Sequence, residues 1–382
     1  MAGLYIHVPF CRQACSYCDF YFVTKMELIP NYVDALIREI GTWSESRWTQ
    51  EEIKTLYFGG GTPSTLSAKQ LERILNEIHK TFDLSQLQEF TFELNPDDAD
   101  PDYLQGLRSL GVDRLSMGIQ SFQPELLAFM HRSHTAEQAI RSLEIIQKAG
   151  FKRFTADLIY GNPGQTMDML DADIDQMLAF DLPHVSAYAL TIEESTRLGK
   201  MRDLGRLNEA EDEDVAKQAV HIQTRLEAAG MHRYEVSNYA KKGAEAVHNT
   251  NYWRHVSYLG LGPGAHSLWH QELEAWRWQN ASDLKAWVSD PVSARTEPEQ
   301  LSVLERAEEY VLLRLRNAEG LDPEILEKQY NYILDSAQWS YWDQLVLMGL
   351  AESGTVLRLT ADGFNLVDRI TVELLTRHDP ID

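Results

Sequence analysis

The sequence predicts an α/β fold in which a partial barrel of the TIM type is followed by a smaller α+β domain. Short runs of β-branched and aromatic residues occur six times between residues 4 and 190, separated by segments with helical periodicity. From about residue 300 the pattern changes to helices with one hairpin. Because alternating strands and helices form parallel sheets with right-handed crossovers, we expect a (βα)6 barrel. A doubly wound open sheet is the alternative.

The expected strands and several helices carry clear local signals. The strands are LYIHV from Leu4, TLYFGGG from Thr55, EFTFELN from Glu89, DRLSMGIQ from Asp113, FTADLIYG from Phe154 and HVSAYAL from His184. Two helices begin with capping boxes, which are formed by Ser67 with Gln70 and by Thr135 with Gln138. A third helix begins at Asp100-Pro101 and ends at Gly111.

The last part of the chain forms a separate unit. Residues 301–382 predict helices over LSVLERAEEYVLLRLR, WSYWDQLVLMGL and TADGFNLVDRITVELL, and a hairpin that turns at Ser353-Gly354. This order is typical of a winged-helix-like domain. We therefore expect a barrel over residues 1–230, a region rich in His and Trp that extends it over 231–300, and the winged-helix-like domain over 301–382.

Charge and apolar patterning exclude several classes of protein. The chain has 35 Lys and Arg against 58 Asp and Glu, which gives a net charge of −23, so its surface should repel nucleic acid and anionic lipid. The last domain shares this balance, with 7 basic against 15 acidic residues, and is read as a packing or partner-docking domain. No apolar run has the length of a membrane span, and MAGLYIHVPF lacks the pattern of a signal peptide, so we expect a cytoplasmic protein.

The three cysteines of the chain lie together in one C-x3-C-x2-C segment, at Cys11, Cys15 and Cys18. Buried structural cysteines have no reason to recur at this spacing, and three thiols cannot pair off as disulfides. A structural zinc ion needs four ligands, and His7 would have to be the fourth. An iron-sulfur cluster is the other reading, since three thiolates hold three irons of a four-iron cubane and leave the fourth iron open.

Polar residues at the ends of the expected strands place a site on one rim of the barrel. In such barrels the chemistry lies at the C-terminal ends of the strands. The cysteine segment follows the first strand, and GGGTP, from Gly59 to Pro63, follows the second. The remaining four strands each offer one polar residue at or near the end: Glu93, Gln120, Asp157 and Tyr188.

Together these motifs resemble the radical S-adenosylmethionine (SAM) superfamily, and more narrowly the oxygen-independent coproporphyrinogen III oxidase family. The resemblance runs from about Tyr5 to the C-terminus. The motifs that carry it are YIHVPF leading into the cysteine segment, GGGTP, ELNP from Glu93, MGIQSF from Met117 and DLIYG from Asp157. It implies a [4Fe-4S] cluster held by Cys11, Cys15 and Cys18, with SAM chelated at the open iron.

The resemblance also implies which residues surround SAM. Glycines let the main chain approach a ligand that a β-carbon would obstruct, so Gly60, Gly61 and Thr62 match the contacts to the methionyl amine. Charged side chains match positions around the methionyl and ribose groups, and further side chains line the same pocket. These residues are Glu93, Arg132, Asp157, Gln120 and Tyr5. For Arg132 a surface salt bridge is the alternative interpretation.

Two departures separate this chain from the oxidase branch of that family. The oxidase motif has a further cysteine two positions after the third, where this chain has Phe20. The oxidase branch also carries a long arm before the cysteines, and here ten residues precede Cys11. Both differences remove parts of the oxidase machinery.

A third motif, HNTNYW from His248, matches the H-N-x-x-Y-W signature of the heme chaperone branch. It implies heme as a third cofactor, with His248 as the iron ligand and Tyr252 and Trp253 as stacking rings. Trp and His are more often part of a core, so His255, His266 and His270 are not assigned to the site.

The favoured hypothesis is a heme chaperone that binds heme and transfers it to acceptor proteins, with a cluster that needs an electron donor. A radical enzyme that decarboxylates coproporphyrinogen III to protoporphyrinogen IX is the alternative. A transient membrane contact and a dimer are compatible with the first hypothesis. No nucleic-acid partner is expected.

Overall fold

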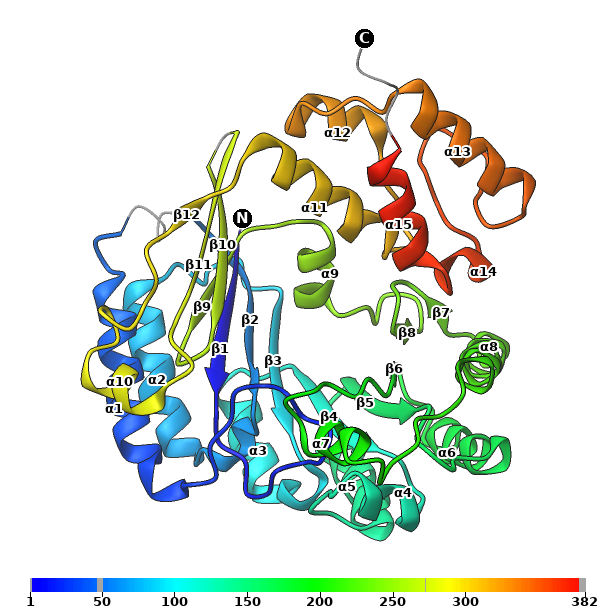
Figure 1. Cartoon of the computed structure of the whole chain (residues 1–382). Helices are drawn as coiled ribbons and strands as arrows, with labels where there is room; N and C mark the ends of the chain where they lie inside the picture. The colour runs from blue at the N-terminus through cyan, green and yellow to red at the C-terminus, as the bar shows by residue number, and fades with distance from the viewer. Residues whose placement is uncertain (1, 47–50, 272, 378–382) are drawn as a thin grey trace.

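The computed structural model describes residues 2–46, 51–271 and 273–377. The six strands expected in the first half are present, and each pairs in parallel with the next (Figure 1). They are β1 (Ala2–Val8), β2 (Ile53–Gly60), β3 (Glu89–Leu94), β4 (Arg114–Gln120), β5 (Arg153–Tyr160) and β6 (His184–Ala189). Their spatial order follows the sequence without the reversal that defines a doubly wound sheet. The partial barrel is therefore confirmed.

The barrel stays open because later strands extend both of its edges. The further strands are β7 (His232–Arg233), β8 (Asn238–Ala240), β9 (Tyr258–Leu261), β10 (His266–Gln271), β11 (Glu274–Gln279) and β12 (Glu299–Gln300). Within the described residues the sheet runs β12-β11-β10-β9-β1-β2-β3-β4-β5-β6-β8-β7. β9 pairs in parallel with β1, whereas β8 pairs antiparallel with β6. Two ends of one sheet therefore remain unjoined.

Helices cover the outside of the parallel strands (Figure 1). They are α1 (Ile29–Thr42), α2 (Ala68–Thr81), α3 (Pro101–Ser109), α5 (Ala136–Lys148), α6 (Met167–Ala179) and α8 (Asp212–Ala228). The short helices α4 (Pro124–Phe129) and α7 (Arg197–Asp203) lie near the cysteine loop, and the 3₁₀ turns are η1 (Met26–Leu28), η3 (Pro63–Thr65) and η4 (Pro96–Asp98). Both predicted capping boxes form, at the starts of α2 and α5. Asp100 caps α3 by accepting hydrogen bonds from two main-chain amides. Local signals thus fixed the starts of these helices.

The inward face of the strands is unusually polar for a barrel core. On neighbouring strands Thr155 Oγ1 lies 3.0 Å from His184 Nδ1 and also accepts a hydrogen bond from Arg114. Apolar residues instead fill the space between the strands and the outer helices, where one hydrophobic cluster runs from Ala2 to Trp287. A barrel whose interior is polar offers hydrogen-bonding groups to a ligand rather than a packed apolar core.

The C-terminal part has its own core. Its helices are α11 (Val303–Leu315), α12 (Pro323–Tyr330), α13 (Ser336–Leu347), α14 (Ala361–Phe364) and α15 (Val367–Thr376), after the short α9 (Val247–Trp253) and α10 (Leu284–Ser289). A second hydrophobic cluster runs from Ala307 to Leu374. The predicted boundaries at 230 and 300 stay predictions; the first cluster continues across residue 230, as an extension of the barrel requires.

Two expectations for this part were wrong in detail. The hairpin around Ser353-Gly354 contains no regular strand; the chain turns back with single bridges such as Ala351 to Leu359. The closing helix is split into α14 and α15, because the chain leaves α14 at Asn365 and begins again at Val367. In the described ranges, no helix combines the length and apolarity that crossing a membrane requires.

Candidate functional site

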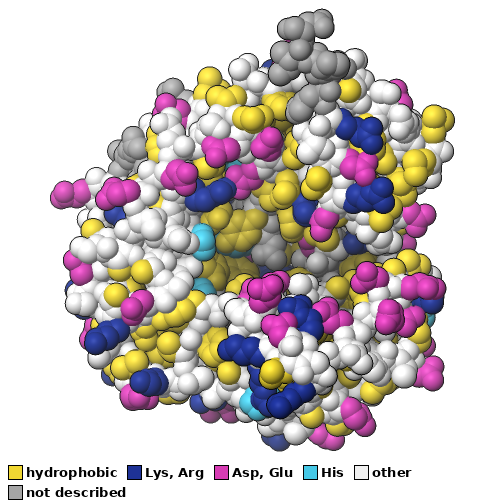
Figure 2. Space-filling view, viewed as in Figure 1, with side chains coloured by type: hydrophobic (Ala, Val, Ile, Leu, Met, Phe, Trp, Pro, Cys, Tyr) yellow, Lys and Arg dark blue, Asp and Glu magenta, His cyan; other side chains and the backbone are white. Residues whose placement is uncertain are grey.

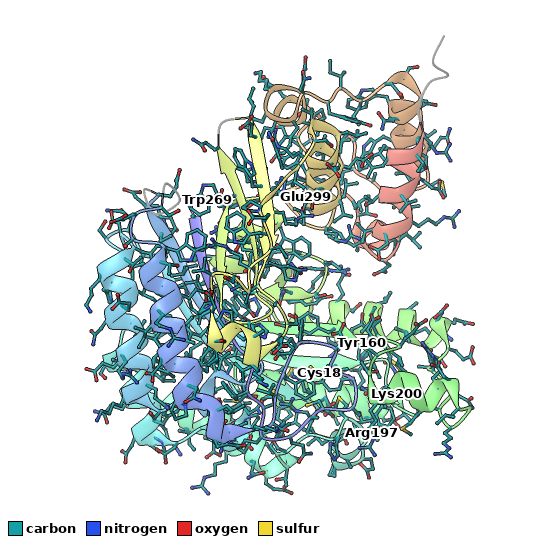
Figure 3. The ribbon with its side chains drawn as sticks, turned by 60° about the vertical axis from the view of Figure 1, so that its left-hand side comes forward. Cys18, Tyr160, Arg197, Lys200, Trp269 and Glu299 are labelled. Carbon is teal, nitrogen blue, oxygen red and sulfur yellow. The ribbon has the colours of Figure 1, made fainter. Side chains whose placement is uncertain are left out.

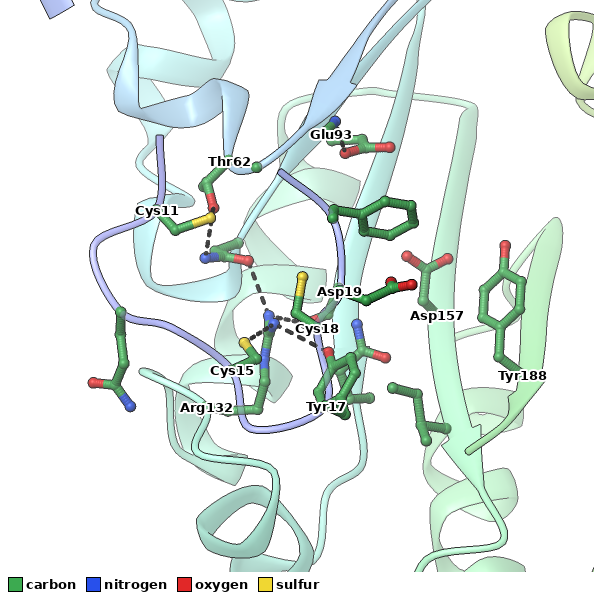
Figure 4. Close-up of a pocket in the computed structure, with 18 of the residues that line it drawn as sticks. Cys11, Cys15, Tyr17, Cys18, Asp19, Thr62, Glu93, Arg132, Asp157 and Tyr188 are labelled. Carbon is green, nitrogen blue, oxygen red and sulfur yellow. Dashed lines mark hydrogen bonds between the residues drawn. The ribbon is translucent and has the colours of Figure 1, made fainter. Parts of the chain in front are cut away.

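A cavity of about 440 Å³ lies at the C-terminal ends of β1 to β6 (Figure 4). It is lined by ten of the residues predicted from the sequence: Cys11, Cys15, Cys18, Gly60, Gly61, Thr62, Glu93, Gln120, Arg132 and Asp157. They come from every strand end from β1 to β5 and from the loops that follow. The parallel topology therefore gathers residues that are up to about 150 positions apart in the sequence.

The cysteine loop has no regular secondary structure but is held at several points. Ser16 donates through its amide to the carbonyl of Met130, 3.0 Å away, and through its hydroxyl to that of Phe129, at 2.9 Å. Leu198, in α7, donates its amide to the carbonyl of Ser16 at 3.0 Å. Three free thiols are thus presented on one anchored loop.

The three thiols are half-buried. Burial raises the pKa of Cys11 and of Cys18 to about 11, partly opposed at Cys11 by a hydrogen bond from Thr62. His7 is not available as a fourth zinc ligand, since its Nδ1 lies 3.1 Å from the Tyr5 hydroxyl and its Nε2 3.0 Å from the carbonyl of Tyr21. Among the described residues, no three His, Cys, Asp or Glu side chains converge on a single-ion site. Three thiols on one loop match the donor set that the resemblance implies for the cluster.

Two glycines bring the end of β2 against the cysteine loop. Gly60 has φ +106°, and a β-carbon there would lie 2.4 Å from the ring of His7. A β-carbon on Gly61 would lie 2.8 Å from the carbonyl oxygen of Val8. The amides of Gly61 and Thr62 donate to the main chain of the β1 end, at 2.9 and 2.7 Å. The structure therefore gives these glycines a packing role beside the predicted approach to SAM.

Two buried carboxyl groups face the cavity with raised pKa values. Glu93 accepts hydrogen bonds from the Tyr57 hydroxyl, at 2.7 Å, and from the amide of Gly60, at 3.2 Å. Burial raises the pKa of Glu93 to about 7 and that of Asp157 to about 6. A cationic ligand would restore their charge, because it favours the ionised form.

Arg132 and Gln120 bring unused hydrogen-bonding capacity to the cavity. Arg132 contacts Cys15 Sγ at 3.2 Å and donates to Asn95 Oδ1 at 2.9 Å, so it lies in the cavity wall rather than in a surface salt bridge. Gln120 has φ +69° at a bulge between β4 and β5. Within the described part of the chain, its Oε1 and the Nε of Arg132 are buried without a partner. Such orphaned groups at a strained position are typical of a ligand site.

The H-N-x-x-Y-W motif lies at the other end of the strands. His248, on α9, is 1% exposed, and its Nδ1 lies 2.8 Å from Oγ1 of Thr55 near the start of β2. Its Nε2 lies 2.7 Å from the Tyr252 hydroxyl. Burial lowers the pKa of His248 to about 4, so the ring is neutral. Neither nitrogen is free for iron in this conformation, and the role of His248 as heme ligand stays a prediction.

The structure separates Tyr5, Tyr252 and Trp253 from the cysteine cavity. Tyr5 was expected in the SAM pocket, but it lines a second cavity together with Tyr252. The reason is its depth along β1, since Tyr5 lies three residues before the strand end. Trp253 is half-buried at the end of α9 and lines neither cavity.

Most other tryptophans of this region belong to the core, as the structural interpretation expects. Trp269 is 3% exposed, Trp278 2% and Trp287 fully buried. Figure 3 shows Trp269 on the strands that extend the sheet, away from Cys18 in the cysteine loop.

Sequence reasoning missed residues whose hydrogen bonds position the predicted site residues. Tyr57 fixes Glu93, and Asn95 joins Arg132 to Thr62, whose hydroxyl lies 3.4 Å from the Asn95 amide nitrogen. Asn95 stood in the ELNP motif, and the alternation of the second strand put Tyr57 on the same face as Gly59. The motif and the strand alternation were visible in the sequence, but neither indicates which side chains Asn95 and Tyr57 bind.

Comparisons with known proteins agree with this geometry. Residues 5–177 match the family model of the radical SAM superfamily. The chain is 34% identical to the heme chaperone HemW of Lactococcus lactis over 97% of this chain and 96% of that protein. It is 35% identical to HemW of Bacillus subtilis over 93% of each. The solved structure of coproporphyrinogen III oxidase (HemN) from Escherichia coli, a radical SAM enzyme, superposes with a TM-score of 0.83 at 21% identity, covering 98% of this chain and 90% of that one.

The fold and the cysteine cavity thus define a radical SAM protein. Within that superfamily, the identity over nearly the full length places the chain in the family of the proteins named heme chaperone HemW. The likeness to HemN shows the fold alone, because the sequence identity is low.

Proposed function

We propose that the protein is a heme chaperone that binds heme and transfers it to acceptor proteins, and that it holds a [4Fe-4S] cluster with SAM at the open iron. The observation that carries the proposal is the full-length similarity to proteins named heme chaperones, combined with a cavity that contains three free thiols. Cytoplasmic location, an electron donor for the cluster, a dimer and a transient membrane contact belong to the same proposal.

The residues of the cysteine cavity fit the two resident cofactors. Cys11, Cys15 and Cys18 would ligate three irons of the cluster. The orphaned Oε1 of Gln120 and the acidic Glu93 and Asp157 suit a ligand with an ammonium and a sulfonium group. When bound, the cluster and SAM supply one-electron chemistry at the sulfonium.

The chain's own part is to bind, orient and charge-match these groups. Thr62 and Arg132 stand beside the sulfur atoms of Cys11 and Cys15, at 3.6 and 3.2 Å. The hydrogen bond from Thr62 lowers the pKa of Cys11, which opposes the effect of burial and so favours the thiolate that binds metal. Tyr57 and the amide of Gly60 fix the carboxyl group of Glu93 for a cation.

Coproporphyrinogen III oxidation is the second candidate, because the motifs of the chain resemble those of the oxidase family. Phe20 opposes it, since it stands where the oxidase branch carries a further cysteine, and is 66% exposed at the cavity. The two candidates differ in what the protein does with a tetrapyrrole.

An anaerobic reconstitution with iron and sulfide separates them. One half of the protein is titrated with heme and followed in the visible spectrum. The other half is incubated with coproporphyrinogen III, SAM and a strong reductant, and the products are analysed. Stoichiometric heme binding without protoporphyrinogen supports the chaperone. Product formation without tight heme binding would refute it in favour of the oxidase.

A further inference from the structure

The second cavity, of about 510 Å³, lies between the strands β1, β9 and β10 and the helix α11. Its volume is within the range of about 300–1,000 Å³ that is typical of ligand pockets. Figure 2 shows a hollow on this face of the molecule, with hydrophobic and histidine side chains at its edge. Five aromatic rings line the cavity: Tyr5, Phe20, Tyr21, Tyr252 and Tyr258. Such a lining suits a flat apolar ring system.

Three histidines line this cavity, and their ring nitrogens differ in availability. Both nitrogens of His7 are bonded within the protein. The side chain of His255 is fully buried, with Nδ1 3.1 Å from the Tyr330 hydroxyl and Nε2 3.5 Å from a carboxylate oxygen of Glu309. His266 is exposed, and its ring has no hydrogen bond to any described residue. Nε2 of His255 also lacks a hydrogen bond, but it is buried beside Glu309, so His266 is the one of these three histidines that is both exposed and without a hydrogen bond to a described residue.

The position of His266 follows from the register of the sheet. Side chains alternate along a strand, so His266 and Leu268 lie on one face of β10, and both line the cavity. Leu268 stands opposite Tyr258 of β9, which supplies one of the rings. Partial burial and the nearby Arg277 lower the pKa of His266, so its ring is neutral, as iron ligation requires.

We propose that this second cavity binds heme, with the imidazole of His266 as iron ligand and the aromatic rings against the macrocycle. The inference rests on the proposed chaperone function and names the site of its cargo. The cavity also contains two acids: Glu309 is paired with Arg277, whereas Asp19 repels carboxylates. The heme therefore enters with its apolar edge first and keeps its propionates toward solvent.

The H-N-x-x-Y-W motif then acts through Tyr252. His248 lies 2.7 Å from the Tyr252 hydroxyl, and the ring of Tyr252 packs edge-on against Tyr258 at 4.7 Å between centroids. Both tyrosines line the cavity. His248 is thus a positioning residue that fixes two rings of the heme site.

Phe20 connects the two cavities. Asp19 and Phe20, which directly follow Cys18, line both the cysteine cavity and the second cavity. The residue that replaces the oxidase-branch cysteine therefore offers its ring to the proposed heme site. The heme and the cluster would be separated by this short segment.

The test is a titration of the full-length protein with ferric heme, followed by visible and electron paramagnetic resonance spectra. We expect His266→Ala to lose the histidine-ligated spectrum and at least tenfold in affinity, and added imidazole to restore the spectrum. His248→Ala should keep the ligand signature and lose less affinity, because only Tyr252 is released. His79→Ala, at an exposed position on α2, is the control and should match the unmodified protein.

A second variant tests the cavity without altering a histidine. Ser282 lies at its exposed edge, and Ser282→Trp should weaken heme binding by filling the entrance. Unchanged spectra and affinity in His266→Ala, or loss of the ligand signature in His248→Ala alone, would overturn the inference while leaving the chaperone function intact. Failure of the unmodified protein to bind heme would instead overturn the function on which the inference rests.

Discussion

The cysteine cavity and the surroundings of His248 lie at opposite ends of the same strands and treat polar groups in opposite ways. In the cavity, the three thiols form no disulfide, and the Oε1 of Gln120 and the Nε of Arg132 have no hydrogen-bond partner among the described residues. Around His248, both ring nitrogens are bonded and the ring packs 5.0 Å from that of Tyr57. A motif can therefore mark either a ligand site or the structure that supports one, and unused bonding capacity distinguishes them.

The largest expected effect is the loss of the cluster from the cysteine cavity. Cys15→Ala removes one of three thiolates, so we expect reconstituted protein to bind little or no [4Fe-4S] cluster, measured by iron and sulfide content. Its free energy of unfolding without metal should change little, because Cys15 is half-buried. Arg12→Ala, in the same loop and exposed, should load normally. If Cys15→Ala bound a full complement of cluster iron, the cysteine cavity would not be the ligand site that the comparison assumes.

Gly60→Ala tests the backbone that supports the cavity. A β-carbon would strike the His7 ring at a residue with φ +106°, so we expect the free energy of unfolding to fall by about 2 to 5 kcal/mol. Gly205→Ala is the matched control: φ is +66° there, but a β-carbon meets nothing within 4 Å, and the loss should be about 1 kcal/mol. Urea unfolding measures both variants, and equal losses would disprove the steric argument.

His248→Ala tests the region around His248, where both ring nitrogens already have partners. It removes a buried ring that is bonded to Thr55 and Tyr252, so we expect a loss of about 2 to 4 kcal/mol in the free energy of unfolding, with the cluster intact. Heme binding should weaken as well. Urea unfolding and iron content are the measurements. A variant as stable as the unmodified protein would show that His248 is held for its ligand, not for its packing.

Glu93→Gln should have the smallest effect, and its sign depends on pH. Because the pKa of Glu93 is raised to about 7, the folded protein binds a proton between pH 4.5 and 7 that the unfolded chain lacks. Its contribution to stability is thus present below pH 4.5 and is lost as pH rises through 7. Glutamine can accept from the Gly60 amide through its oxygen and donate to the Tyr57 hydroxyl oxygen through its NH2 group, and it does not ionise. The variant should therefore gain about 1 to 3 kcal/mol over the unmodified apoprotein between pH 5 and 8.

Urea unfolding at pH 5 and at pH 8 measures this gain in stability. Glu137→Gln, at an exposed site on α5, should show no such gain. A variant that is destabilised equally at both pH values would mean that the carboxyl group of Glu93 supports the fold rather than a ligand. If Glu93→Gln is more stable without cofactors but binds SAM more weakly, the carboxyl group of Glu93 serves ligand binding.

The sequence predicted those features that depend on neighbours along the chain. The cysteine spacing, the capping boxes and the six strands are all local, and the parallel topology then brings the strand ends together. The bonds between Tyr57 and Glu93, and between Asn95 and Arg132, join different strands and depend on register, which spacing alone does not specify. For His248, the motif gives the residue type but not whether the nitrogens meet protein or ligand.

The pairing of β1 with β9 has a consequence for how the protein is made. Gly3 lies opposite Tyr258, so the first strand gains its second neighbour only after most of the chain has been synthesised. Glu89, at the start of β3, likewise waits for the amides of Val247 and His248, which it binds at 2.9 Å. Until then β1 is an exposed edge, open to pairing with other chains. A ribosome-bound barrel is thus incomplete, and a fragment ending at residue 230 should aggregate.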